Sequence, residues 1–261
     1  MAEDGASAMA AAPSPLSVDK PVLIDAAMSY FSARPRFAIY LKGLENEITL
    51  KTPAELGGLK SPTYLKMNPQ GKMPILILPA SDGRVIPESE VITQYILDRY
   101  AASGSGPAPA LSTVDERLTE NLLKRLLDTY VCVNIGAFYT TLEADQRLAK
   151  LVELRKQVGI LDGYVKAAPY AAGEFSSADI AMFPAFVFVK RISALTCGWE
   201  DVFKGCPNLA KWWATITQHP VAQKLQSEME SGMSESTIEP WLTASGALSQ
   251  FKNTEFEWKL C

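Results

Sequence analysis

The sequence predicts an α/β domain followed by an all-α domain. Up to residue 101, short runs rich in β-branched residues alternate with segments of helical periodicity. From residue 113 onward only the helical periodicity recurs, and a stretch rich in Ser, Gly and Pro separates the two parts. A chain of 261 residues is long enough for each part to bury a core of its own.

These changes in composition divide the chain. Residues 1–20 are rich in Ala, Ser and Pro, and their first fifteen positions lack the basic residues of a targeting signal, so we expect a disordered tail. The α/β domain spans 21–101, the linker 102–112 and the helical domain 113–230. Residues 231–261 form a C-terminal extension to which the sequence assigns no role.

The α/β domain begins with a predicted strand at 22–24, where three apolar residues include two that are β-branched. The apolar spacing that follows predicts a helix over 32–44. Proline is tolerated in the first turn of a helix because its missing N–H has no partner there. We therefore expect the helix to begin near Ser32, which places Pro35 in that first turn. A second strand is predicted at 47–50.

The rest of this domain is predicted to contain a connector, a β-hairpin and a helix. A short helix is predicted at 61–67 and a third strand at 73–78. Asp82-Gly83 is typical of a tight turn, and it leads into a fourth strand at 84–86. A third helix is predicted to begin at Glu88 and to run to about residue 100. The predicted order is therefore β-α-β-β-β-α.

The C-terminal part is predicted to contain two long antiparallel helices, one with an apolar stripe over 118–138 and one over 148–168. The segment 177–193 is almost wholly apolar, so we expect it to be the buried centre of the domain. Two shorter helices follow, each with a proline at its start, over 207–217 and 220–230. His219 precedes the second of these, where it is better explained as a capping or packing residue than as a base.

Composition excludes several classes of function. Hydrophobic residues make up 48% of the chain and charged residues 21%, and the formal net charge of −4 disfavours a nucleic-acid partner. No apolar run is long enough to span a membrane. The cysteines Cys132, Cys197, Cys206 and Cys261 are scattered without metal-ligand spacing, so we expect no metal and a reduced, cytoplasmic setting.

Three stretches in order, YLKMNPQGKMPILI, DGRVIPESEVITQYILDRY and GEFSSADIAMFPAF, resemble the cytosolic glutathione transferase family. The resemblance covers roughly residues 21–230. It implies a thioredoxin-like N-terminal domain that binds glutathione as cosubstrate and an all-helical C-terminal domain. It also implies a pocket for a small hydrophobic electrophile and assembly as a homodimer.

The resemblance implies a cis peptide bond at Met73-Pro74. Such a bond turns the backbone N–H and C=O of Met73 toward a ligand, so that an extended peptide such as glutathione can pair with them like an added strand. Lys72 resembles the basic residue that many members of the family use near the glycine carboxylate of glutathione. A solvated surface lysine is the alternative.

Glu88-Ser89 lies where the third helix is predicted to begin, and a helix N-terminus favours a carboxylate. The resemblance assigns Ser89 to the γ-glutamyl carboxylate of glutathione and Glu88 to its ammonium group. Plain helix capping is the alternative for both residues. In the helical domain, Ser176 and Asp179 resemble the capping box of the family, a folding element rather than a catalytic one.

The turn MSYFSARPRF before the first helix offers Ser29, Tyr30 and Ser32 as the catalytic hydroxyl. In this family one hydroxyl donates a hydrogen bond to the glutathione thiolate, and lowering the thiol pKa by about two units requires roughly 2.7 kcal/mol. Serine-type classes (tau, phi, zeta) place their serine four or five residues before the arginine that Arg34 matches, which selects Ser29. Tyrosine-type classes show a run similar to Tyr30-Phe31 onward, so Tyr30 is the alternative, and Ser32 is expected to cap the helix.

No cysteine stands in this turn, whereas the cysteine-type relatives place one there. We therefore expect glutathione conjugation, with glutathione-dependent peroxide reduction as a related activity, rather than thiol-disulfide exchange. A non-catalytic ligand carrier or protein-interaction module of the same fold is the alternative from a different class. A glutathione-dependent isomerase is a third hypothesis, and it would need a pair of basic residues to hold a dicarboxylate.

Overall fold

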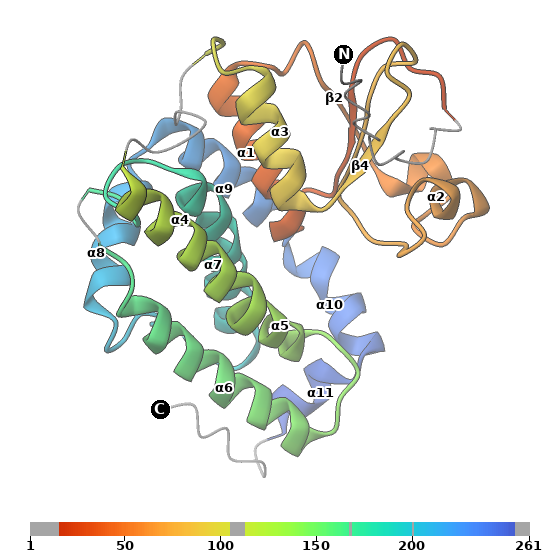
Figure 1. The fold of residues 1–261 in the computed structure, drawn as a ribbon. Coiled ribbons are helices and arrows are strands. Elements are labelled where there is room, and N and C mark those ends of the chain that lie inside the picture. Colours follow the sequence, from red (N-terminus) through yellow and green to blue (C-terminus); the bar gives the residue numbers. More distant parts are fainter. Residues whose placement is uncertain (1–15, 105–112, 167–168, 200, 254–261) are drawn as a thin grey trace, which may run out of the picture.

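The computed structural model describes residues 16–104, 113–166, 169–199 and 201–253. An α/β part and a larger helical part lie side by side, with the helices α1 and α3 between the sheet and the helical part (Figure 1). Most of the predicted tail, most of the predicted linker and the last eight residues of the extension lie outside the described residues.

The sheet has four strands in the order β2-β1-β3-β4. They are β1 Val22–Ile24, β2 Thr49–Lys51, β3 Ile75–Ile77 and β4 Val85–Pro87. The first pair is parallel because a helix connects β1 to β2, whereas β3 pairs antiparallel with both β1 and β4. Gly83 has a φ of 70° in the turn between β3 and β4, a value that glycine adopts without steric cost. The predicted order and fold class are confirmed.

The first helix, α1 Tyr30–Lys42, begins two residues earlier than predicted. Ser29 has an extended backbone and caps the helix, since its Oγ accepts a hydrogen bond from the Ser32 N–H at 3.2 Å. The expectation that Ser32 is the cap is therefore wrong, and Pro35 lies inside the helix rather than in its first turn. The side-chain cap and the packing of this segment outweigh the cost of the proline.

The remaining elements of the α/β part position its loops. A 3₁₀ turn, η1 Pro53–Leu56, and the short helix α2 Pro62–Met67 connect β2 to β3. The helix α3 Ser89–Arg99 follows β4 directly and packs against α1, as Figure 1 shows.

The first long helix of the helical part is α4 Val114–Leu126. It continues through a π-helical turn, η2 Leu127–Val131, into α5 Cys132–Ile135 and a final 3₁₀ turn, η3 Gly136–Phe138. The second, α6 Ala144–Asp162, ends well before the predicted position near residue 168, with Gly163 following it. At this end of α6 the Asp162 carboxylate accepts from the Leu209 N–H and the Asp162 carbonyl accepts from the Asn208 side chain, so a tertiary contact takes up the helix end.

The later helices are α7 Ser177–Thr196, α8 Pro207–Ile216, α9 Pro220–Gly232, α10 Glu235–Ala244 and α11 Ala247–Lys252. Every side chain of α7 from 177 to 189 is buried, which confirms that this segment is the centre of the helical part. Two long-range contacts hold α10 and α11 against that part. Trp241 stacks on Tyr139, and the Gln250 side chain exchanges hydrogen bonds with Arg147 and the Leu142 carbonyl.

The start of α7 is fixed by Ser176 and Asp179, which form the reciprocal hydrogen bonds of a capping box. The other carboxylate oxygen of Asp179 accepts from the Trp212 indole at 2.7 Å and from the Ala171 N–H at 3.0 Å. Complete burial raises the pKa of Asp179 to about 6. The side chain of Asp179 therefore joins three segments of the helical core. His219 caps α9, with its Nδ1 accepting from a backbone N–H at 3.2 Å.

Candidate active site

One pocket of the α/β part brings together the residues that the sequence assigned to glutathione. It is lined by Phe31, Asn68, Gln70, Lys72, Met73, Pro74, Glu88 and Ser89. Two short loops supply most of this lining, the one before β3 and the one between β4 and α3. Ser29 does not line this pocket, although Phe31, two positions later in the sequence, does.

The loop before β3 is anchored by side chains of α2 and of the residue that follows it. The Lys72 carbonyl accepts hydrogen bonds from the Tyr64 hydroxyl at 2.6 Å and from Asn68 Nδ2 at 2.8 Å. The Met73-Pro74 peptide bond is cis, and Pro74 is buried while Met73 is half-buried. Within the described residues, the backbone of Met73 makes no hydrogen bond. Its N–H and carbonyl are therefore available to a ligand with an extended backbone.

The loop between β4 and α3 places a helix N-terminus on the same pocket. Glu88 has a φ of 70°, the one positive φ outside glycine among the described residues. Such values are uncommon for a residue with a side chain and concentrate at functional sites. Ser89 is the first residue of α3 and is only 5% exposed, whereas the Glu88 side chain is exposed. A carboxylate in the pocket would meet the unpaired N–H groups of this helix end.

The hydroxyl of Ser29 lies at the N-terminus of a second helix, α1, and is half-buried. Its oxygen accepts from the Ser32 N–H, which leaves the hydroxyl hydrogen free to be donated. The side chain of Ser32 is fully buried and has no hydrogen-bond partner within the described residues. Of these two serines, only Ser29 is accessible to a ligand.

Tyr30 points into the helical part instead of the pocket. Its ring lies 5.2 Å from that of Phe188 on α7, and its hydroxyl is hydrogen-bonded with that of Tyr139. The side chain is 6% exposed, and burial raises the pKa of Tyr30 well above its usual value. A hydroxyl buried in the helical part is out of reach of a thiol in the pocket.

The helix α1 is tied to the helical part by an ion pair that the sequence did not reveal. Arg34 is 1% exposed, and its two terminal nitrogens donate to both carboxylate oxygens of Asp128, at 2.6 and 3.1 Å. Asp128 belongs to the π-helical turn η2, where a wider helix changes the direction of the side chains. The one signal in the sequence was an isolated aspartate in an otherwise apolar stripe.

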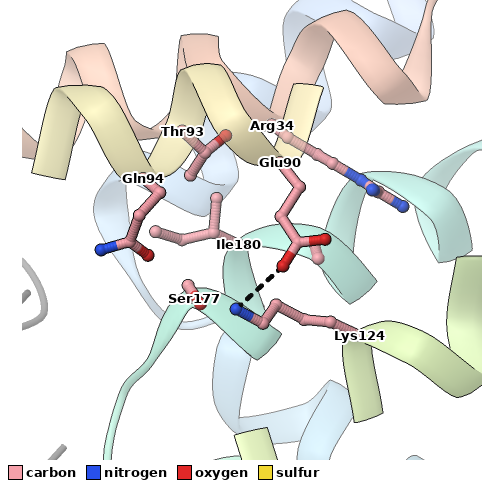
Figure 2. Close-up of a pocket in the computed structure, with 8 residues that line it drawn as sticks. Arg34, Glu90, Thr93, Gln94, Lys124, Ser177 and Ile180 are labelled. Carbon is pink, nitrogen blue, oxygen red and sulfur yellow. Dashed lines mark ion pairs between the residues drawn. The ribbon is translucent and has the colours of Figure 1, made fainter. Parts of the chain in front are cut away.

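A second, very small pocket lies behind Ser89, where α1, α3, α4 and α7 meet. Figure 2 shows that Glu90 of α3 and Lys124 of α4 point toward one another across it, and their charged atoms are 3.2 Å apart. Lys124 is buried, so this pair fixes the first turn of α3 against the helical part. The volume of about 10 Å³ admits no more than a water molecule, so this is a domain contact and not a ligand site.

The helical part contains an aromatic cluster around Tyr139. Tyr139 stacks on Trp241 of α10 with ring centroids 4.5 Å apart and meets Phe188 edge-on at 5.9 Å. Cys132 is buried nearby, and this burial raises the pKa of its thiol to about 12, so it is no nucleophile. Within the described residues no helix is both long and apolar enough to cross a bilayer, and no cluster of metal-ligating side chains occurs.

Comparisons with known proteins identify the family of both parts of the chain. The family model for the N-terminal domain of glutathione S-transferases matches residues 23–107, and the model for their C-terminal domain matches residues 126–220. The probable glutathione S-transferase BZ2 of Zea mays is 30% identical over 217 residues, which cover 78% of this chain and 89% of that protein.

Solved structures show the same fold. Glutathione transferase F7 of Populus trichocarpa has a TM-score of 0.65 and 21% identity, over 80% of this chain and 99% of that one. A tau-class glutathione S-transferase of mango, Mangifera indica, has a TM-score of 0.64 and 22% identity, over 82% of this chain and 95% of that one.

Proposed function

Because this chain belongs to the glutathione S-transferase family, we propose that it binds glutathione and transfers its thiolate to small apolar electrophiles. The observation that carries this proposal is one pocket that contains the cis Met73-Pro74 corner, the start of α3 at Ser89 and the cation of Lys72. A tripeptide with a carboxylate at each end and a thiol between them matches these three features.

In the proposed complex, the cysteinyl backbone of glutathione pairs with the N–H and C=O of Met73. Ser89 and the N-terminus of α3 bind the γ-glutamyl carboxylate, and Glu88 accepts hydrogen bonds from the ammonium group beside it. Lys72 faces the glycine carboxylate. These contacts place the thiol toward the start of α1, where Ser29 stands.

Ser29 is the proposed catalytic residue. Its hydroxyl donates a hydrogen bond to the thiolate, and the positive end of the α1 dipole adds to the stabilisation. The thiolate then attacks an electrophilic carbon, a sulfur–carbon bond forms, and the leaving group departs with its electron pair. With a hydroperoxide, the thiolate attacks the terminal peroxide oxygen, the O–O bond breaks and the alcohol leaves after taking up a proton. A second glutathione thiol then condenses with the resulting glutathione sulfenic acid to give glutathione disulfide and water.

The burial of Tyr30 against Phe188 favours Ser29 over the tyrosine alternative. The absence of Ser29 from the pocket lining favours a second candidate function, a glutathione-binding carrier without turnover. An isomerase is not favoured, because Lys72 is the single cation among the residues that line the pocket.

We also propose a homodimer located in the cytoplasm. Val114, Leu118 and Leu122 form an apolar stripe along α4 in which the first two side chains are 71% and 63% exposed. Such a stripe is typical of a surface that a partner covers. Sedimentation of the wild type and of Leu118→Glu tests this, and a wild type that sediments as a monomer would contradict it.

The function is tested with the purified full chain by calorimetry with glutathione, followed by conjugation of a halonitrobenzene. We expect binding at millimolar glutathione or below, and turnover above the uncatalysed rate. Binding without turnover on any electrophile or hydroperoxide would favour the carrier. No heat of binding at millimolar concentrations would exclude both functions.

A further inference from the structure

The loop 25–28, which leads from β1 to the catalytic turn, rests on the end of α9. Gly232 is the last residue of that helix, and a Cβ placed on it would lie 3.0 Å from the Met28 nitrogen and 3.1 Å from the Ala27 Cβ. Nine in ten real Cβ contacts are longer than this, so a methyl group at this point would require the loop to move by a few tenths of an ångström. The Ser29 N–H donates to the Ala26 carbonyl at 2.9 Å, which connects Ser29 to the same loop.

A second contact joins the loop to α9 through Arg36. This side chain is 2% exposed, and it donates to the Asp25 carboxylate at 2.6 Å and to the Ala27 carbonyl at 2.8 Å. Its Nε lies 3.5 Å from the carboxylate of Glu228, one turn before Gly232 on α9. Tyr40 fixes that carboxylate from the other side, with its hydroxyl 2.9 and 3.0 Å from the two oxygens.

From these contacts we propose that Gly232 and Glu228 are positioning residues, which set where the Ser29 hydroxyl stands relative to a bound thiol. The proposal rests on the function proposed above. Both residues lie beyond residue 220, where the match to the family model ends. Neither residue lines the pocket around Met73 and Ser89. A movement of the loop should therefore shift Ser29 without changing the contacts that bind glutathione.

The decisive variant is Gly232→Ala, with Gly159→Ala as its matched control. Gly159 is also helical, on α6, but a Cβ on it would meet nothing within 4 Å. We expect Gly232→Ala to lower kcat about three- to tenfold and to raise the apparent pKa of the bound thiol in the pH profile. The KM for glutathione and the unfolding midpoint should stay close to those of the control.

Rescue distinguishes positioning from general damage. Adding Ala27→Gly removes one of the two closest contacts of the new side chain and leaves the Met28 nitrogen, so the double variant should recover part of the lost kcat and of the pH shift. Glu228→Gln, which keeps an acceptor for Tyr40 but removes the charge facing Arg36, should shift the profile in the same direction. The proposal would be overturned if Gly232→Ala and Glu228→Gln both kept the wild-type pH profile. It would also be overturned if the double variant lost as much kcat as Gly232→Ala alone.

Hydrogen exchange of the ligand-free protein tests the loop without any need for activity. We expect the amides of residues 25–33 to exchange faster in Gly232→Ala than in the wild type or Gly159→Ala. Unchanged exchange in all three would refute the positioning contact even in an active enzyme. Faster exchange in a chain that shows no turnover would instead refute the proposed function and retain the contact.

Discussion

The two sides of the candidate site are held by contacts of very different range. On the peptide side, the Lys72 carbonyl is held by Tyr64 and Asn68, which are eight and four residues away in sequence. On the catalytic side, Arg34 reaches Asp128 across 94 residues, and the loop before Ser29 rests on α9. A single segment therefore builds the corner at Met73, whereas the turn at Ser29 needs both domains packed together. The start of α3 at Ser89 lies between these cases, because the Glu90–Lys124 ion pair fixes it against the helical part. Binding and turnover should respond separately to mutation.

Ser29→Ala is the largest expected test of that separation. Loss of the hydroxyl that we propose as donor to the thiolate should lower kcat/KM for conjugation about 10²- to 10³-fold, as the loss of a single preorganised donor does elsewhere. Retention on immobilised glutathione should remain. Tyr30→Phe serves as the control and should change kcat little, because its hydroxyl is turned toward Tyr139. A stronger loss in Tyr30→Phe than in Ser29→Ala would reverse the assignment.

Asp128→Ala should lower the unfolding free energy, because it removes the ion pair between α1 and the helical part. It leaves the buried Arg34 guanidinium without its carboxylate partner, which costs about 3 kcal/mol of unfolding free energy. Denaturant unfolding measures this loss, and Glu153→Gln, which breaks an exposed pair with Lys156, is the control that should leave stability unchanged. Equal stability of the two variants would show that the Arg34 pair does not hold the domains together.

Ser89→Ala tests the glutathione-binding side of the site alone. Removing one hydrogen bond to a carboxylate should weaken glutathione binding about tenfold, while kcat at saturating glutathione stays within about twofold. Calorimetry and steady-state kinetics give the two numbers independently. A fall in kcat with unchanged affinity would mean that the two sides of the site are coupled after all.

The smallest effect concerns pH and the cap of α9, the helix that supports the catalytic turn. Partial burial lowers the pKa of His219, and its Nδ1 must be unprotonated to accept the cap hydrogen bond. This stability is therefore fully present above the unfolded pKa of about 6.5 and is lost as the pH falls through the lower folded value. We expect a loss of about 1 kcal/mol relative to His219→Asn, whose amide caps at any pH.

Since His219 is the one histidine of the chain, its ring resonances can be followed by NMR without ambiguity. A folded pKa above 6.5, or parallel stability profiles of wild type and His219→Asn between about pH 7 and 5, would contradict this prediction.

Local signals in the sequence were enough for the elements around the pocket. Strand composition, the Asp82-Gly83 turn and proline at helix starts depend on neighbouring residues, and the strands and most helices lie within a few positions of the predictions. The errors arose where distant contacts decide. The predicted start of α1 was wrong because it assumed that proline is tolerated only in the first turn of a helix. The packing of α1 offsets the energetic cost of Pro35 inside the helix.

The same reason limited the prediction of the site. Residues at the two corners, such as Met73 and Ser89, carry a motif within a few positions. Asp128 and Gly232 come close to the site through folding alone, and apart from the apolar surroundings of Asp128 their neighbours in sequence give no sign of it. The role of residues 235–252 as two packed helices was likewise absent from any local pattern.

The contact between Gln250 and Arg147 has a consequence for biosynthesis. Arg147 is fully buried in the helical part, and the Gln250 side chain that binds its Nε is separated from it by 103 positions. While the ribosome is still translating the codons in between, that nitrogen has only water as a partner. The helical part therefore lacks one partner of a buried side chain until α11 has been synthesised, so its packing is completed late in translation.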